Sequence, residues 1–476
     1  MMLKQILTIT LTCLGLIVAN LIISCGAISQ LDSFKQFEDI EIEGDFKSAI
    51  IAINTLTLNS SERENVGLPP AKPDQSISYL NTNSHTMPLI FVEPIFKKST
   101  QISSQKKPTN QTNTLSFLNE EPETIEFYDP FQEKKIHATK TTSNNSCIIY
   151  IETSSQAELL ESNSFNYNLA SAMNYIDTSI INNATELLGP SLGTPLDIDN
   201  NNKIIIFITT IKNNQGIEQE NIHGFHWNDN LSDSHEHSNK RELLYINKNN
   251  IINKTYKHVI AHEYVHLLVA SYRIKQSKNS NFETWLEEGI AEGLSPYLSN
   301  QKNITREAFR SLNYQEIVNG NGPFYTSEDI RVEPYILGYT FLDYCRIQMN
   351  QEAEFYKHLI ETMIESNTTN YKSLDSIIKT FNPSGNPDVI KNFQDAFTSY
   401  KIANHVKHPS NKYGYKNHSY ANYIPNMQSP THNLLSLEAG GSIYFIEGDY
   451  TKSAINDFTP EESGKNIKFI RIKPTN

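Results

Sequence analysis

The chain of 476 residues contains only four cysteines, which limits the cross-links and metal sites that it can build. Cys13 and Cys25 lie in or next to the apolar N-terminal segment, so only Cys147 and Cys345 remain for the folded part. Neither has the paired spacing of a cysteine-ligated zinc centre, which excludes that class of site. Both have apolar neighbours, and the sequence leaves open whether they form a disulfide or stay buried thiols.

The chain also has fewer basic than acidic residues. The chain has 40 lysines and arginines against 53 aspartates and glutamates, a formal net charge of −13. This acidic balance argues against nucleic acid as a partner, because binding the phosphate backbone requires a basic surface. The acidic residues are spread along the chain, which indicates a solvated surface. We find no internal repeat, and the length allows two to three domains with a sizeable core.

The first residues have the features of an export signal. Lys4 is the only charged residue before an apolar run from Ile6 to Ile23. Ser24-Cys25 then resembles the end of a bacterial lipobox, so we expect a lipoprotein signal peptide at 1–24, lipid on the cysteine and a polar tether at 25–45. An uncleaved membrane anchor and an ordinary secretory signal are the alternatives. All three place the protein outside the cytoplasm. The first places it in the bacterial cell envelope, anchored to a membrane by lipid and either periplasmic or surface-exposed.

The rest of the chain mixes strand and helix patterns. Apolar residues spaced three to four apart predict one or two helices within 155–188. β-Branched runs predict strands at 49–53, 89–92, 124–127, 148–151, 204–208, 243–246, 442–446 and 467–472. We expect a β-rich N-terminal domain at 46–140, an α+β domain at 141–400 and a C-terminal β module at 401–476. Residues 97–114 are almost entirely polar and predict a disordered loop.

The most informative motif is His262-Glu263-Tyr264-Val265-His266. Residues four apart on a helix project from the same face, so both histidines can bind one zinc ion from adjacent turns. Glu263 lies one position round the helix, within reach of a water molecule held by the metal. The flanking segments are apolar on nearly all sides and predict a buried helix, in which such polar residues need partners. A surface helix that merely carries two histidines is the alternative.

An acidic segment downstream, Trp285-Leu286-Glu287-Glu288-Gly289-Ile290-Ala291-Glu292, can supply a third ligand. The residues alone do not decide between Glu287 and Glu288. The segment resembles the W-L-x-E-G-x-A motif of the gluzincin metallopeptidases, the group that contains thermolysin and the zinc aminopeptidases. The resemblance implies that Glu288 is the ligand and that Glu292 orients the His262 ring, with a solvent-facing Glu292 as the alternative. Glu287 is then a charge at a helix N-terminus.

A tyrosine segment follows at a distance typical of the same group. Pro334-Tyr335-Ile336-Leu337-Gly338 resembles the P-Y-x-x-G segment of the aminopeptidase branch. The resemblance implies that the Tyr335 hydroxyl stabilises the oxyanion of the transition state. Tyr339 is the alternative donor, and simple aromatic packing is the alternative role for Tyr335.

Over a longer stretch, from Leu188 to Tyr344, the chain resembles the hyicolysin family of bacterial secreted neutral metallopeptidases. This resemblance implies a thermolysin-like α+β fold and one catalytic zinc ion held by His262, His266 and Glu288. Glu263 is then the general base for attack of the zinc-bound water on a peptide bond. The Gly-x-Met-x-Asn strand of exopeptidases is not apparent, which favours an endopeptidase acting on proteins or peptides.

Two functions of other kinds compete with this one. The chain could be a non-catalytic surface lipoprotein, such as an adhesin or envelope component, on a degenerate protease fold. It could also be a zinc hydrolase of another amide, such as a cell-wall peptide. The sequence gives no indication of the oligomeric state.

Two other segments carry groups of potential metal ligands. Asp197, Asp199 and Asn201 alternate as in a calcium loop, but the loop lacks glycine at its sixth position and glutamate at its twelfth. A turn before the next strand is therefore favoured over calcium. His223, His226, His235 and His237 surround Trp227, and a solvated loop is favoured over a second metal site.

Overall fold

The computed structural model divides the chain into two compact units, which we describe separately. The described residues are 38–55, 64–66, 121–219, 222–278, 281–301, 320–324, 333–382, 385–418, 426–427, 429, 435–449 and 466–475. Cys25, the predicted loop at 97–114 and the predicted strand at 89–92 lie outside them, so nothing further is said of their structure.

A mixed six-stranded sheet forms the base of the larger unit, in the order β4-β5-β6-β7-β9-β8. Its strands are β4 (Thr124–Asp129), β5 (Lys134–Ser143), β6 (Cys147–Glu152), β7 (Ile204–Thr209), β8 (Gly224–His226) and β9 (Leu243–Asn247). The three strands β6, β7 and β9 run parallel, whereas β4, β5 and β8 pair antiparallel with their neighbours. The continuous isoleucine run in β7 is fully buried, as expected for a strand covered on both faces.

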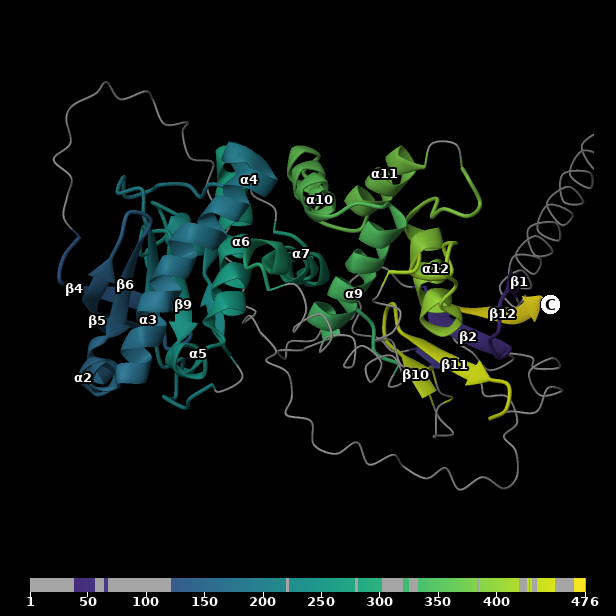
Figure 1. The fold of residues 1–476 in the computed structure, drawn as a ribbon, viewed down its shortest axis with the longest axis horizontal. Coiled ribbons are helices and arrows are strands. Elements are labelled where there is room, and N and C mark those ends of the chain that lie inside the picture. The colour runs from purple at the N-terminus through teal and green to yellow at the C-terminus, as the bar shows by residue number, and fades with distance from the viewer. Residues whose placement is uncertain are drawn as a thin grey trace, which may run out of the picture. The chain divides into compact units, whose positions relative to one another are not determined.

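Helices connect and cover these strands (Figure 1). The crossover from β6 to β7 contains α2 (Thr153–Glu161), α3 (Asn163–Tyr175), a π-helical turn (Ile176–Ile180) and α4 (Ile181–Leu192). After β9 the chain forms α5 (Lys248–Asn253) and the long helix α6 (Tyr256–Lys275). Because α6 packs against both β8 and β9, the edge of the sheet positions it.

The second half of this unit is helical. Its elements are α7 (Thr284–Leu298), α9 (Glu333–Gln348), α10 (Ala353–Glu365), α11 (Lys372–Phe381) and α12 (Phe393–Val406). Helix α7 packs against α6 on one side and α9 on the other. This middle position lets α7 carry side chains toward both neighbours.

The smaller unit joins the two ends of the described chain. Its four-stranded sheet has the order β1-β12-β2-β11, with β1 (Glu38–Glu43), β2 (Ala49–Asn54), β11 (Ser442–Ile446) and β12 (Ile467–Thr475). A separate pair joins β3 (Glu64–Val66) and β10 (Leu435–Leu437). Every residue of β2 is buried, since this strand lies between two strands from the far end of the sequence.

The observed strands confirm the predicted ones at seven of the eight sites, the eighth being the masked segment at 89–92. They do not fall into separate terminal modules: strand 49–53 pairs with C-terminal strands, whereas strand 124–127 belongs to the six-stranded sheet. Residues 38–43 of the predicted tether form β1. The mixed helix and sheet content agrees with the α+β prediction, and the domain boundaries stay a prediction. None of the helices in the described part of the chain is long and apolar enough to cross a membrane.

Candidate metal centre

Helix α6 carries the three motif residues and is buried along almost its whole length. The side chains of His262, Glu263 and His266 lie in a run of buried residues, with His266 the most exposed at 3%. As predicted from the sequence, the apolar residues on either side of the motif are buried on every face of the helix. Two histidines and a carboxylate in such a place require compensation by charge or hydrogen bonding.

Helix α7 supplies that compensation through Glu288. Its Oε2 lies 3.4 Å from His262 Nε2 and 3.6 Å from His266 Nε2. The two Nε2 atoms are themselves 3.1 Å apart. The neighbouring Glu287 turns elsewhere and reaches Arg273 Nη2 at 3.5 Å. The structure thus brings Glu288, not Glu287, to the histidine pair.

These three donor atoms fit a small metal ion. Ligands at about 2.0–2.1 Å from a tetrahedral zinc ion are roughly 3.3 Å from one another. The observed separations of 3.1, 3.4 and 3.6 Å lie around that value. Two imidazoles and one carboxylate are also a donor set that zinc commonly has in catalytic sites. The donor set and its spacing therefore fit zinc.

Glu292 connects the histidines of α6 one turn further along α7. Its Oε1 lies 3.2 Å from His262 Nδ1, and its Oε2 lies 3.2 Å from His258 Nε2. His262 therefore has its Nε2 toward Glu288 and its Nδ1 toward Glu292. Sequence reasoning missed His258, although its position four residues before His262 places it on the same helix face.

The electrostatics of this cluster favour a cation. Burial opposes charge on His262, but Glu292, Glu288 and Glu263 outweigh it and hold the pKa of that ring well above its usual value. Burial raises the pKa of Glu292, but His258 and His262 lower it overall to about 2. Burial raises the pKa of Glu288. The buried carboxylates of Glu263, Glu288 and Glu292 thus place an excess of negative charge beside the histidine rings. A divalent cation bound here would offset that charge.

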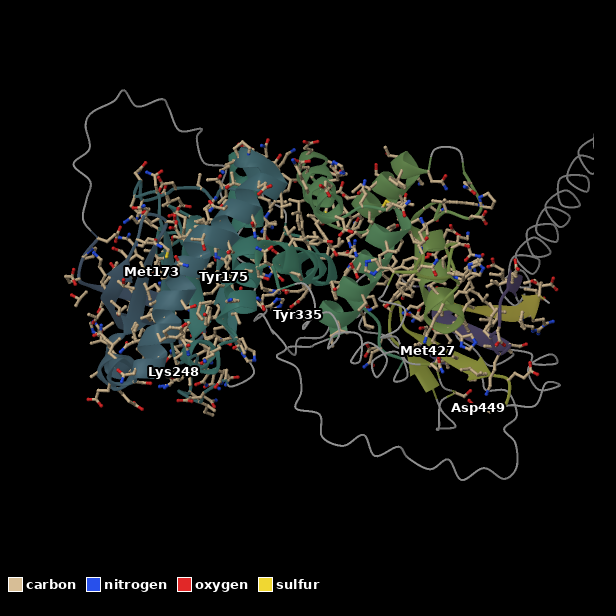
Figure 2. The ribbon with its side chains drawn as sticks, in the orientation of Figure 1. Met173, Tyr175, Lys248, Tyr335, Met427 and Asp449 are labelled. Carbon is tan, nitrogen blue, oxygen red and sulfur yellow. The ribbon has the colours of Figure 1, made fainter. Side chains whose placement is uncertain are left out.

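Tyr335 enters the site from the first turn of α9, where that helix approaches α7 (Figure 2). Its side chain is 2% exposed, and its hydroxyl donates a hydrogen bond to the Glu288 carboxylate. Tyr339 packs in the same small cluster. The structure therefore places the predicted oxyanion donor beside the predicted third ligand.

Glycines allow α7 and α9 to approach so closely. A Cβ added at Gly338 would lie 2.4 Å from the backbone oxygen of Trp285, well inside van der Waals contact. A Cβ at Gly289 would lie 2.8 Å from Leu342 Cδ1 and 3.0 Å from the Gly338 carbonyl carbon. The glycine of the predicted P-Y-x-x-G segment is thus a packing residue that brings Tyr335 to Glu288.

Glu263 lies against the edge strand β8. A Cβ added at Gly224 would be 3.2 Å from Glu263 Cγ and 2.9 Å from Val259 Cγ1, so only glycine fits here without displacement. β8 pairs with β9 on one side and with no strand of the described chain on the other. An edge strand therefore runs beside the predicted general base.

The predicted solvated loop around Trp227 is wrong in part. His226 ends β8, is 4% exposed and has its Nδ1 3.2 Å from the Leu243 oxygen. Burial lowers the pKa of His226 to about 3, and His266 contributes in the same direction. Trp227 is buried as well, whereas His237 stacks on Tyr128 at the surface. The four histidines form no joint metal-binding group among the described residues.

The two cysteines of the folded part are free and buried. Burial raises the pKa of the Cys147 thiol to about 12 and that of Cys345 well above its usual value. Of the two alternatives left open by the sequence, the structure shows buried thiols.

Comparison with known proteins adds one relative. No family model matches the chain. The chain is 24% identical over 336 residues to the neutral metalloprotease ShpI of Staphylococcus hyicus. That alignment covers 67% of this chain and 72% of ShpI. The chain is thus distantly similar to a metalloprotease, and its buried groups of histidine and glutamate are of a kind that could hold a metal ion.

Proposed function

We propose that the chain is a zinc-dependent endopeptidase of the gluzincin type, with a thermolysin-like catalytic domain. The observation that carries the proposal is the convergence of His262 Nε2, His266 Nε2 and Glu288 Oε2 within 3.6 Å of one another. The similarity to a neutral metalloprotease supports the same class of activity. A chain that had lost this function would be expected to have lost at least one of these residues.

The residues of the site divide the work of peptide hydrolysis among them. When bound by His262, His266 and Glu288, zinc supplies Lewis-acid polarisation and acidifies water. Glu263 accepts the proton of the attacking water and returns it to the nitrogen of the leaving amine. The Tyr335 hydroxyl donates a hydrogen bond to the negative charge that develops on the carbonyl oxygen.

The surrounding residues hold these groups in place. Glu292 accepts the Nδ1 hydrogen of His262, which fixes the tautomer with a lone pair on Nε2. The low exposure of the whole cluster limits competition from bulk water for each hydrogen bond.

The edge strand β8 favours an extended peptide as substrate. It runs beside Glu263, and its outer side pairs with no strand in the described ranges. An extended chain can add to such an edge through backbone hydrogen bonds, which do not depend on sequence. This recognition needs no free amino terminus, so it suits an endopeptidase.

Cleavage of casein and of a peptide blocked at both ends, by wild type and Glu263→Gln, tests the proposal. We expect wild type to cut both internally and the variant to be slower by roughly 10²–10⁴-fold with its zinc content unchanged. Equal rates in the two proteins would remove Glu263 from the mechanism. If the chain bound zinc and hydrolysed only cell-wall peptides, the result would favour a zinc hydrolase of another amide. If it bound zinc and hydrolysed nothing, the result would favour a non-catalytic surface lipoprotein.

We also propose that lipid on Cys25 anchors the protein outside the cytoplasm. The support is the apolar run that ends at Ile23 and the small residue before the cysteine. Metabolic labelling with palmitate should mark the wild-type chain and not Cys25→Ser. Equal labelling of both chains would contradict the anchor.

A further inference from the structure

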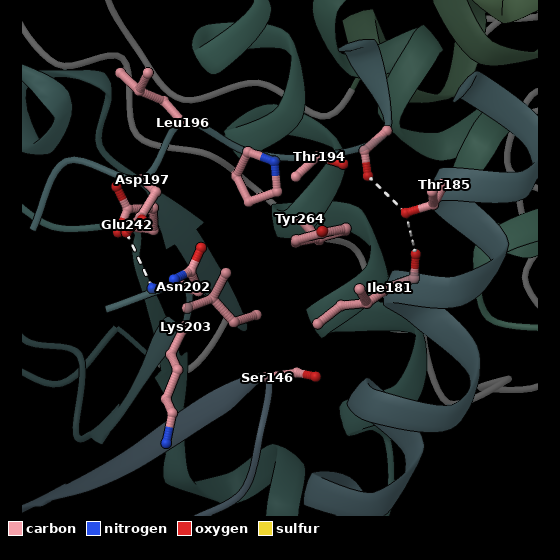
Figure 3. Close-up of a pocket in the computed structure, with 13 residues that line it drawn as sticks. Ser146, Ile181, Thr185, Thr194, Leu196, Asp197, Asn202, Lys203, Glu242 and Tyr264 are labelled. Atoms are coloured by element: carbon pink, nitrogen blue, oxygen red, sulfur yellow. Dashed lines mark hydrogen bonds between the residues drawn. The ribbon is translucent and has the colours of Figure 1, made fainter. Parts of the chain in front are cut away.

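A second group of potential metal ligands lies away from the zinc-type cluster, where the connection after α4 meets the start of β9. Carboxylate oxygens of Asp197, Asp199 and Glu242 lie within 4.8 Å of one another. Figure 3 shows Asp197 and Glu242 beside each other at one end of a cavity. Carboxylates gathered in this way repel one another unless a positive charge lies between them.

Glu242 is the residue that points to a missing partner. Glu242 is buried, with an exposed fraction of only 2%. Its Oε1 accepts a hydrogen bond of 2.6 Å from the backbone N–H of Ile198. Its Oε2 is buried and accepts no hydrogen bond from any described residue. A buried carboxylate oxygen without a donor is destabilising, so a ligand for it is expected.

The nearby cations are directed elsewhere. Arg241 Nη1 lies 2.7 Å from Asp199 Oδ2 and 2.7 Å from Glu121 Oε1, so it offsets the charge on that side of the cluster. Lys203 extends away from Asp197 and Glu242 in Figure 3. The charge on the Glu242 side is therefore left without a protein cation among these neighbours.

The loop before β7 has no glycine at its sixth position, yet its backbone there has the conformation that glycine gives a calcium loop. Asn202 occupies the sixth position and has φ 56°, the left-handed conformation that glycine normally supplies. Asp197 Oδ1 accepts hydrogen bonds of 3.1 Å from the N–H groups of Asn201 and Asn202. The twelfth position, Ile208, is buried in β7, but Glu242 brings a carboxylate to the same place from another element.

The cavity beside the cluster leaves room for water. It measures about 180 Å³ and is lined by Asp197, Asn202 and Glu242 at one end. Tyr264 of α6 forms part of its wall, and its buried hydroxyl makes no hydrogen bond with described residues. Because Tyr264 is two residues from both His262 and His266, it faces away from the zinc-type cluster. The cavity is thus separate from the proposed catalytic site.

We propose that Asp197, Asp199 and Glu242 bind one hard divalent cation, calcium, with water from the cavity completing its coordination. The donors are all oxygen, which disfavours zinc and other metals that prefer nitrogen or sulfur. An irregular loop with carboxylates from two elements suits the flexible six-to-eight-fold coordination of calcium better than the strict octahedron of magnesium. The ion ties the α4–β7 connection to β9 and so stabilises the sheet that supports α6.

Calcium binding to the full chain tests this proposal independently of activity. The measurements use Glu263→Gln as the parent, which avoids self-cleavage, with zinc present throughout. We expect calorimetry to show one bound Ca²⁺ per chain and calcium to raise the melting temperature by about 4 °C. Magnesium at the same concentration should give a smaller rise.

Variants locate the ion. Glu242→Gln, added to the parent, should weaken calcium binding roughly tenfold or more and abolish the thermal shift. Asp197→Asn should do the same and serves if Glu242→Gln does not fold. Glu186→Gln, an exposed acid on α4, is the matched control and should bind calcium like the parent. No calcium binding by the parent, equal binding by the Glu242 and Asp197 variants, or a preference for magnesium would overturn the proposal.

Discussion

The Tyr335 hydroxyl has two possible hydrogen-bond acceptors during catalysis, the Glu288 carboxylate and the substrate oxyanion. In this structure it binds Glu288, whereas the proposed mechanism has it bind the substrate oxyanion. We predict that Tyr335→Phe lowers kcat by about 10²–10³-fold and leaves KM and zinc affinity almost unchanged. Tyr339→Phe, from the same buried cluster, is the matched control and should keep kcat. A loss of zinc with normal kcat at saturating zinc would instead make Tyr335 a positioning residue for Glu288.

Glu292 acts through His262 rather than on substrate. Since it lies 3.2 Å from His262 Nδ1, Glu292→Gln should weaken zinc binding about 10–100-fold by loosening the ring's orientation. His258→Gln should have a smaller effect, because His258 lies beside the other oxygen of Glu292, at 3.2 Å from Oε2, and not beside the one that faces His262. Competition with a zinc-selective dye measures both. Unchanged zinc affinity in Glu292→Gln would show that the carboxylate does not support the ligand.

Glu152 should contribute a pH-dependent part of the stability. Burial raises its pKa, but hydrogen bonds from Ser154, Thr209 and Thr210 outweigh burial and leave the pKa lowered overall. A folded pKa below the unfolded value of about 4.3 means that this stabilisation is present at neutral pH and is lost as the pH falls through the folded pKa. The urea midpoints of wild type and Glu152→Gln should therefore differ at pH 7, and this difference should shrink as the pH falls through the folded pKa of Glu152. A difference that grows in acid would contradict the assignment.

At this scale the sequence was informative where spacing determines geometry. His262, Glu263 and His266 follow from helical periodicity, and Glu288 was chosen over Glu287 through a resemblance. The partners of His258 and Glu242 could not be predicted, although His258 shares a helix face with His262 in the sequence. The contact of His258 with Glu292 depends on how α6 and α7 cross, and that of Glu242 with Asp197 on sheet order. Local sequence contains neither kind of information.

At the scale of elements, the crossing of α7 and α9 positions the third ligand and the tyrosine together. Gly338→Ala places a methyl group 2.4 Å from a backbone oxygen that cannot move freely. We predict destabilisation by about 1–3 kcal/mol and a fall in kcat, because α9 must shift and take Tyr335 with it.

Gly289→Ala provides a graded comparison for this crossing. Its added methyl group would first meet the Leu342 side chain, which can rotate, so its effect on unfolding in urea should be smaller. Equal effects of the two variants would argue against a backbone clash at Gly338.

For the whole molecule, the pairing of chain ends makes the smaller unit depend on its last strand. β2 lies between β11 and β12 in the sheet, and all its residues are buried. Removal of 466–476 should therefore increase hydrogen exchange in 49–54, while β7 of the larger unit stays protected. Unchanged exchange at 49–54 would contradict the pairing. Sequence patterns predicted these strands but not their partners, because strand pairing between the ends is set by tertiary contacts.

The zinc content of purified Glu288→Ala and Glu287→Ala tests the central claim most directly. The two residues are neighbours on one helix, yet only Glu288 reaches the histidines, at 3.4 and 3.6 Å. We predict about one zinc ion per chain in wild type and in Glu287→Ala, and loss of most zinc and of casein cleavage in Glu288→Ala. No stoichiometric zinc in wild type, or full zinc in Glu288→Ala, would contradict the proposed metal site.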